Sequence, residues 1–170
     1  MKTLLMIFSL IFTFSAHANF IQDVKDRFQG VTYVGYEDWY NKGDTAFAEY
    51  DGLSYGVYQK LKVAVRENEI NIKMQFINGT VRPDADHFAR VTSELCVAIF
   101  QPFVSTVDTT KKSSSWDDAT APVIDAPLSF MFTEKNNDTN SNSINKKING
   151  WDVSIKRSAL LTSCTARKLN

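Results

Sequence analysis

The sequence predicts an α+β domain, with an antiparallel sheet of about five strands, one long amphipathic helix packed on it and a short N-terminal helix. Three features support this prediction. Residues 60–76 alternate between apolar and polar side chains, residues 87–103 carry apolar side chains at helical spacing, and residues 128–166 contain three more alternating segments. The chain has 170 residues, of which 44% are hydrophobic, a length and composition typical of one globular domain.

The first eighteen residues are typical of a secretory signal peptide. Lys2 precedes an apolar run from Leu4 to Phe14, and the segment ends in the small-x-small pattern of Ala16 to Ala18. The apolar run is shorter than the roughly twenty residues that a membrane-spanning helix needs. We therefore expect cleavage after Ala18, a periplasmic or secreted domain of residues 19–170, and no membrane span after cleavage.

Two cysteines, Cys96 and Cys164, occur in a chain predicted to enter an oxidising compartment. This favours a Cys96–Cys164 disulfide that would join the long helix to the last strand. A two-cysteine metal site and a nucleophilic cysteine are the alternatives. A structural zinc site needs four ligands, and His87 would be the only histidine left after cleavage, so no metal site is predicted.

The N-terminal half begins with a predicted amphipathic helix over residues 20–29, ended by Gly30. The pattern leaves the structure of residues 31–59 open and resembles a loop. Residues 60–66 and 70–76 are predicted to form a hairpin of two half-buried strands around the polar break at Glu67 to Glu69.

The C-terminal half begins with the long helix, predicted from His87 to Phe103 after a start signal at Pro83 and Asp84. Residues 106–122 are polar and predict an exposed loop. Three strands are expected with inward faces Leu128/Phe130/Phe132, Trp151/Val153/Ile155 and Leu160/Thr162/Cys164/Ala166. Between the first two, the asparagine-rich segment 135–149 predicts a flexible connection.

Composition excludes several classes of function. The 19 basic and 19 acidic side chains give no net charge, which disfavours a nucleic-acid binder. The chain contains no motif for a nucleophilic serine, a phosphate loop, a dinucleotide or a zinc protease, so no catalytic residue and no cofactor is predicted.

Catalysis has two weaker candidates. His87 could act as a base oriented by Asp84, Asp86 or Glu94, although a surface histidine in the first helical turn is the interpretation that we favour. The carboxylate pairs 37–38 and 117–118 could serve a hydrolase, although adjacent acids point in different directions on a regular element. The second pair lies beside Trp116 and could also suit sugar stacking or calcium, but its spacing matches no calcium loop and a solvated turn is the interpretation that we favour.

All six tyrosines fall within residues 33–58, beside Trp39 and Phe47. Tyrosine and tryptophan are frequent in binding hot spots, although some of these rings must pack in the core. Residues 37–51 also hold five acids against Lys42, which suits a basic protein partner. The predicted binding residues are Tyr33, Tyr36, Trp39, Tyr40, Tyr50 and Tyr55.

The C-terminal end is basic, with six cations against Asp152: Lys146, Lys147, Lys156, Arg157, Arg167 and Lys168. Such charges protect the edge of a sheet from pairing, and they could also contact an acidic partner or phosphate groups.

The sequence thus predicts an exported protein that acts by binding a protein partner in the cell envelope. An inhibitor or immunity-type protein that blocks a toxin or enzyme is the concrete form of this hypothesis, which rests on compartment, size and the missing catalytic motifs. A cell-envelope hydrolase that uses carboxylates and a small-ligand carrier with a cavity between helix and sheet are the alternatives. The oligomeric state and the identity of the partner are not encoded in any motif.

Overall fold

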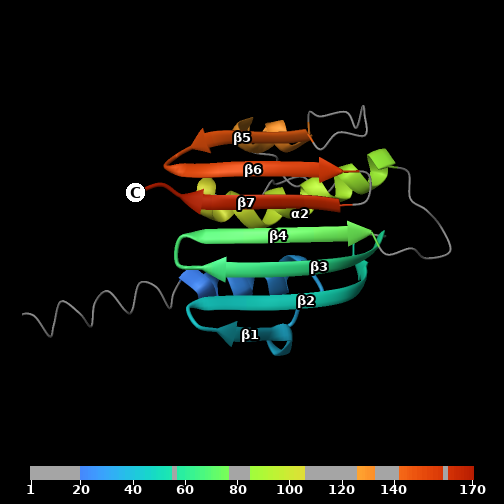
Figure 1. Ribbon diagram of the computed structural model, residues 1–170, viewed down its shortest axis with the longest axis vertical. Coiled ribbons are helices and arrows are strands. Elements are labelled where there is room, and N and C mark those ends of the chain that lie inside the picture. Colours follow the sequence, from blue (N-terminus) through green and yellow to red (C-terminus); the bar gives the residue numbers. More distant parts are fainter. Residues whose placement is uncertain (1–19, 55–56, 77–84, 106–125, 133–141, 159–160) are drawn as a thin grey trace, which may run out of the picture.

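The computed structural model of the chain contains one antiparallel sheet of seven strands, with helices against one of its faces (Figure 1). It describes residues 20–54, 57–76, 85–105, 126–132, 142–158 and 161–170. The strands lie in the spatial order β1-β2-β3-β4-β7-β6-β5. Their bounds are β1 Trp39–Lys42, β2 Thr45–Ser54, β3 Val57–Arg66, β4 Glu69–Phe76, β5 Asn142–Ile148, β6 Trp151–Ser158 and β7 Leu161–Lys168. This arrangement confirms the predicted α+β class, whereas the expected number of about five strands was too low.

Two of the additional strands, β1 and β2, come from the aromatic region whose structure the sequence left open. A two-residue turn at Gly43 and Asp44 joins them, and Gly43 has a φ of 63°, which glycine adopts without steric cost. The inward positions of β2 include Ala46, Ala48 and Gly52, which are small. Since those residues give no strong apolar alternation, the strand pattern was hidden.

The third additional strand is β5, which lies in the segment expected to be a flexible connection. Asn149 and Gly150 form a hairpin turn between β5 and β6 with φ values of 48° and 80°. Positive φ at both central residues is typical of a type I′ turn, for which Asn-Gly is a favoured sequence. Ile144 and Ile148 pack against the core from this strand. The rest of that segment, residues 135–141, lies outside the described residues.

The strand expected around Leu128 is instead the 3-10 helix η3 (Ala126–Phe132). Leu128 and Met131 are fully buried, three residues apart, as the period of such a helix requires. The apolar pattern Leu128, Phe130, Phe132 matched a strand, but the additional burial of Met131 fits only the helical period.

Both predicted helices and the four other predicted strands are confirmed. Residues 20–31 form the N-terminal helix, two residues longer than expected, and α2 spans Ala85–Val104. A short 3-10 helix, η1 (Tyr36–Asp38), precedes β1. The predicted hairpin is β3 and β4, and two of the three predicted C-terminal strands are β6 and β7. The expected loop 106–122 and the start signal at residues 83–84 lie outside the described residues.

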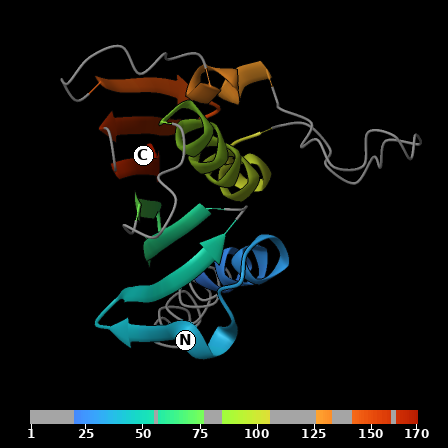
Figure 2. The ribbon, with the colours of Figure 1, turned by 90° about the vertical axis from the view of Figure 1, so that its right-hand side faces the viewer.

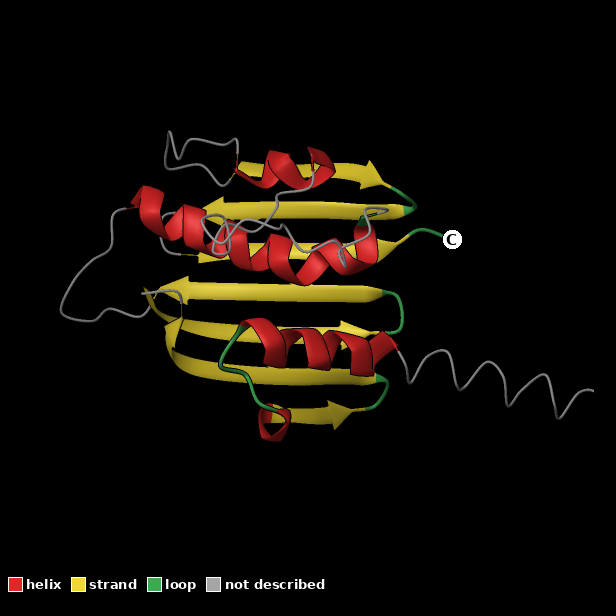
Figure 3. Ribbon diagram, turned by 180° about the vertical axis from the view of Figure 1, so that it is seen from behind, coloured by secondary structure: helices red, strands yellow, loops and turns green. Residues whose placement is uncertain are grey.

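The N-terminal helix and α2 pack on the same face of the sheet (Figure 2). Seen from that side, the N-terminal helix covers the β2–β3 half and α2 covers the half around β7, with η3 towards β5 (Figure 3). The largest buried side chains of the helices include Phe28, Leu95, Ile99 and Phe100. The opposite face of the sheet carries none of the described helices.

The predicted disulfide between Cys96 and Cys164 is confirmed. It links α2 to β7, and both cysteines are buried in the core. The side chain of Arg27 adds a second tie, because its Nε donates a hydrogen bond of 2.7 Å to the carbonyl of Ala98 and so joins the two helices.

Candidate functional site

The sheet face opposite the helices, called the open face below, carries most of the charged side chains of the strands. The strand register places eight cations and four acids on it. The cations are Lys42, Lys60, Lys62, Arg66, Lys73, Lys147, Lys156 and Arg167, and the acids are Glu49, Asp51, Glu69 and Asp152. The open face is therefore positive by four charges, although the whole chain is neutral.

A hollow of about 410 Å³ lies on the β1–β4 half of the open face. Ala64 of β3 lies at its centre in the register, opposite Phe47 of β2 on one side and Asn71 of β4 on the other. A methyl group between larger side chains leaves a depression that neighbouring residues surround. The other lining residues are Tyr40, Thr45, Ala48, Glu49, Lys62, Val63, Arg66, Glu69 and Lys73.

One wall of the hollow is aromatic. The rings of Tyr40 and Phe47 stack with centroids 5.6 Å apart and an interplanar angle of 20°. Tyr40 is 51% exposed in spite of this contact. The half-exposed ring of Tyr40 offers rigid apolar area with a polar hydroxyl at its edge, which is typical of binding surfaces.

Charges line the other sides of the hollow. Lys62 Nζ forms an ion pair with Glu49 Oε1 at 3.1 Å. On the far side of Ala64, Arg66 Nε donates to Thr45 Oγ1 at 3.0 Å. Glu69 is the register partner of Arg66, but its carboxylate binds Arg167 Nε at 3.1 Å instead.

The six residues predicted to form one binding surface are distributed over different parts of the molecule. Tyr40 lies on the open face, whereas Trp39 and Tyr50 point to the helix-covered face and pack against the core. Tyr33 is 69% exposed and stacks on Tyr50, with centroids 6.3 Å apart. Tyr55 lies outside the described residues.

Tyr36, the remaining member, belongs to η1 and is tied to the N-terminal helix. Its hydroxyl donates a hydrogen bond of 2.9 Å to Asp26 Oδ1, which also accepts one of 2.6 Å from Gln22 Nε2. The pKa of Tyr36 is raised above its ordinary value of 10.0, chiefly by that hydrogen bond to Asp26.

The acids of residues 37–51 are largely engaged within the chain. Asp51 and Glu49 form ion pairs with Lys60 and Lys62 of the neighbouring strand, at 3.2 and 3.1 Å. Asp38 Oδ2 accepts the backbone N–H of Gly35 at 2.7 Å. The local negative charge counted along the sequence is thus offset by β3, which weakens the reason for expecting a basic partner.

The basic C-terminal residues divide between the two faces. Lys147, Lys156 and Arg167 lie on the open face, Lys146 sits 5.1 Å from the Phe130 ring centroid, and Lys168 is exposed beyond the core. The sixth, Arg157, is only 5% exposed and donates hydrogen bonds to Ser93 Oγ and the carbonyl of Met131. Arg157 therefore has a structural role in joining β6 to α2 and η3.

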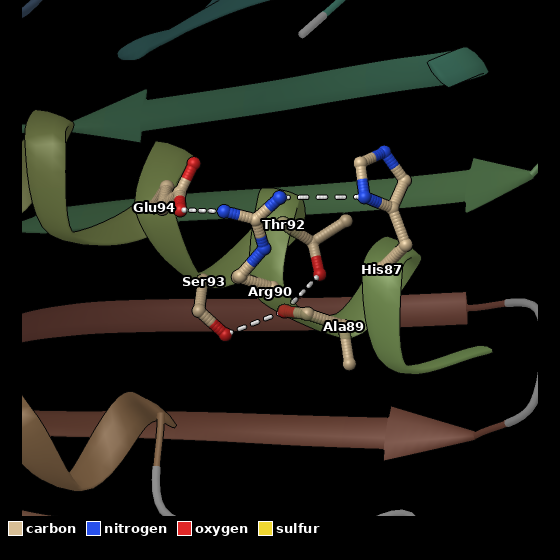
Figure 4. Close-up of polar contacts among 6 residues, drawn as sticks. All are labelled: His87, Ala89, Arg90, Thr92, Ser93 and Glu94. Carbon is tan, nitrogen blue, oxygen red and sulfur yellow. Dashed lines mark hydrogen bonds and ion pairs between the residues drawn. The ribbon is translucent and has the colours of Figure 1, made fainter. Parts of the chain in front are cut away.

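His87 has no carboxylate against its ring among its described contacts. Arg90 stands between it and Glu94, with Nη2 3.4 Å from His87 Nδ1 and Nη1 3.4 Å from Glu94 Oε1 (Figure 4). Two hydroxyls of the same helix, Thr92 and Ser93, bond to the Ala89 carbonyl (Figure 4). Of the three carboxylates considered for orienting His87, Glu94 is therefore engaged by Arg90, and the side chains of Asp84 and Asp86 lie outside the described part of the chain.

The structure describes one of the two predicted carboxylate pairs. Asp117 and Asp118 lie outside the described residues, and Glu37 and Asp38 belong to η1. In the described part of the chain, no group of three histidine, cysteine, aspartate or glutamate side chains could hold a metal ion. Among the same residues, no helix is both long and apolar enough to cross a membrane.

The sequence missed Phe47, Ala64, Asn71 and Lys73 as lining residues of the hollow. The alternating pattern of β3 and β4 indicates which of their residues face outward, Asn71 and Lys73 among them. The hollow, however, also needs Phe47 of β2, a strand that was not predicted. Comparison with known proteins adds nothing to this geometry, because no family model, no curated protein and no solved structure matches the chain.

Proposed function

We propose that this chain is an exported binding protein whose open face docks onto a protein partner in the cell envelope, and that it acts as an inhibitor or immunity-type protein. The hollow beside the Tyr40–Phe47 stack carries this proposal. An antiparallel sheet commonly leaves one face to water, and such a face needs neither exposed stacked rings nor a depression. Both features are those of a surface that receives another molecule.

Two further observations support the compartment and the mode of action. A buried disulfide persists in oxidising compartments, which agrees with the signal peptide that the first eighteen residues predict. The two glutamates that line the hollow, Glu49 and Glu69, are each held in an ion pair with a neighbouring strand. Carboxylates engaged in this way favour binding over acid–base chemistry.

A small-ligand carrier is the second candidate, and the volume of the hollow favours it. About 410 Å³ falls within the range of ligand pockets, roughly 300–1,000 Å³. The carrier hypothesis placed a cavity between the helices and the sheet, whereas this hollow lies on the opposite face. A ligand there would be held on an open surface, which suits part of a larger partner better than an isolated small molecule.

Binding to the products of the genes that flank this one tests the proposal. An immunity-type protein is expected beside its toxin, so we expect one purified product to bind in calorimetry and to lose its toxic or enzymatic activity. Tyr40→Ala should weaken that binding by roughly thirtyfold, the effect of a hot-spot side chain worth about 2 kcal/mol.

Tyr33→Ala is the matched control, because it removes an exposed tyrosine outside the open face. It should leave the affinity within about twofold of the original. Equal losses in both variants, or a loss at Tyr33 alone, would place the interface away from the open face and contradict the proposal.

A further inference from the structure

Two lysines face one another at the edge of the hollow. Lys62 of β3 and Lys73 of β4 are register partners, and both are exposed on the open face. Like charges placed directly opposite each other on neighbouring strands destabilise a sheet. Glu49 relieves Lys62 through its ion pair, but among the described residues the side chain of Lys73 has neither an ion pair nor a hydrogen bond.

A second cation lacks a carboxylate on the other side of Ala64. Among the described contacts, the Arg66 side chain donates a hydrogen bond to the Thr45 hydroxyl and forms no ion pair. Glu69, its register partner, forms its ion pair with Arg167. Arg66 lies four residues beyond Lys62 on β3, a separation of roughly 13 Å at 3.3 Å per residue. The hollow thus presents a cation at each end and the uncharged residues Ala64 and Asn71 between them.

We propose that the hollow binds an extended segment of a protein partner that carries two acidic side chains four residues apart. One carboxylate pairs with Lys73 and the other with Arg66, while the uncharged residues between them lie over Ala64 and beside the Tyr40–Phe47 stack. The spacing of the two cations along the strand direction matches the spacing of the two acids in an extended chain. This inference rests on the proposed function and names the chemistry of its partner.

The charge pattern favours a polypeptide over nucleic acid or another continuous polyanion. Glu49 and Glu69 both line the hollow, and Asp51 and Asp152 lie on the same open face. An unbroken row of phosphates crossing this face would meet these carboxylates as well as the lysines. Two acidic side chains at chosen positions can reach Lys73 and Arg66 and place fewer negative charges beside these acids, of which Glu69 lies opposite Arg66.

The first test needs no partner. Lys73→Gln removes the charge opposite Lys62, so it should raise the Tm of the free protein by about 1–3 °C. Lys168→Gln, which removes an exposed charge outside the open face, should leave the Tm unchanged. A lower Tm for Lys73→Gln would mean that Lys73 stabilises the fold, and would overturn the inference that its charge is held for a ligand.

The second test uses a seven-residue peptide with glutamates at its second and sixth positions, threonines at its ends and valine at its centre. Titrated into the purified protein, it should shift the amide resonances of Ala64, Asn71 and Lys73, and its affinity should fall as salt is added. Lys73→Gln should weaken the binding roughly tenfold, because a charged hydrogen bond is lost. Lys168→Gln should leave it unchanged, and a peptide with glutamines in place of the glutamates should not bind.

The alternative ligands give distinct results. Inorganic phosphate or a single-stranded oligonucleotide that shifts the same resonances more strongly than the peptide would overturn the assignment to an acidic polypeptide. If the peptide shifts none of the three resonances, the inference is wrong. The proposed function would still stand if Tyr40→Ala weakened the binding of a flanking gene product and Lys73→Gln did not. The partner would then dock on the open face without using two acidic side chains.

Discussion

Trp39 and Tyr40 are consecutive residues of β1, and their side chains lie on opposite faces of the sheet. The Trp39 ring packs edge-on against Phe28 of the N-terminal helix at 5.6 Å, with Lys25 Nζ 5.6 Å from its centroid. Tyr40 stacks on Phe47 at the wall of the hollow. Two neighbouring rings that the sequence assigned to one binding surface therefore lie in different environments.

Substituting each ring separates stability from binding. Trp39→Ala should lower the free energy of unfolding by about 3 kcal/mol, since it removes a half-buried ring that packs on the core. Tyr40→Ala should lower it by less than about 1 kcal/mol, because half of that side chain is exposed. Urea denaturation of the two variants measures both values. A Tyr40 loss as large as that of Trp39 would show that the stack on the open face belongs to the fold.

Reduction of the disulfide should destabilise the domain. The bond closes a loop of 68 residues, for which chain entropy predicts about 4 kcal/mol, and measured losses are commonly 2–4 kcal/mol. Denaturant midpoints with and without reductant give the difference. Thiol labelling of the unfolded, unreduced protein should find no free cysteine, and two labelled thiols would contradict the bond.

The reductant itself needs a control. A Cys96→Ala/Cys164→Ala variant should show the lower midpoint under both conditions. If reductant lowers the midpoint of this variant as well, the effect does not come from the disulfide.

The elements with strong periodicity were predictable. Strand β4 alternates apolar and polar residues over its whole length, and β3 alternates from Lys60 to Arg66 apart from Ala64. Helix α2 places Leu95 and Ile99 on one buried face. The cysteine pairing followed from their number and the predicted compartment. In these cases a single local rule decides the structure.

The elements that were missed depend on features that one-dimensional patterns record poorly. Apart from Tyr50, the inward positions Ala46, Ala48 and Gly52 of β2 are small, so the strand lacks the run of large apolar side chains that reveals a buried face. β5 is polar, with Ile144 and Ile148 alone packed against the core, and its clearest signal was the Asn149–Gly150 turn. The apolar pattern of the 3-10 helix η3 also fits a strand, and the burial of Met131 distinguishes the helix from a strand.

The site was less predictable than the fold, because it is made by register. The positive charge of the open face combines lysines of β3 and β4 with cations of β5 to β7, and only the β4–β7 pairing brings the two groups together. The same register cancels the acidic charge of residues 49–51 against Lys60 and Lys62. A charge count along the chain records neither effect.

The structural role of the buried Arg157 can be tested against its exposed neighbour Lys156. Arg157→Met should lower the free energy of unfolding by about 1–3 kcal/mol, because the Met131 carbonyl and the Ser93 hydroxyl lose a charged donor in the core. Lys156→Met removes an exposed cation of the same strand and should change the stability by no more than about 0.5 kcal/mol. Chemical denaturation of both variants gives the comparison, and equal effects would contradict the assignment of Arg157 to the core.

The hydrogen bond that links η1 to the N-terminal helix should be visible as one tyrosine that ionises at a higher pH than an ordinary tyrosine. Asp26 accepts a hydrogen bond from the Tyr36 hydroxyl, which stabilises the protonated phenol and raises the pKa of Tyr36 above 10.0. A group whose pKa is raised on folding stabilises the fold fully below its unfolded pKa, and this contribution is lost as the pH rises through the folded pKa. The link should therefore be intact at neutral pH and lost only in strong alkali. The difference in tyrosinate absorbance between the original protein and Tyr36→Phe isolates this titration. Asp26→Asn should return the pKa of Tyr36 towards 10.0. Asp23→Asn, a matched change in the same helix, should leave the pKa of Tyr36 raised. If Tyr36 titrates identically in the original protein and in both variants, Asp26 is not the cause of the raised pKa.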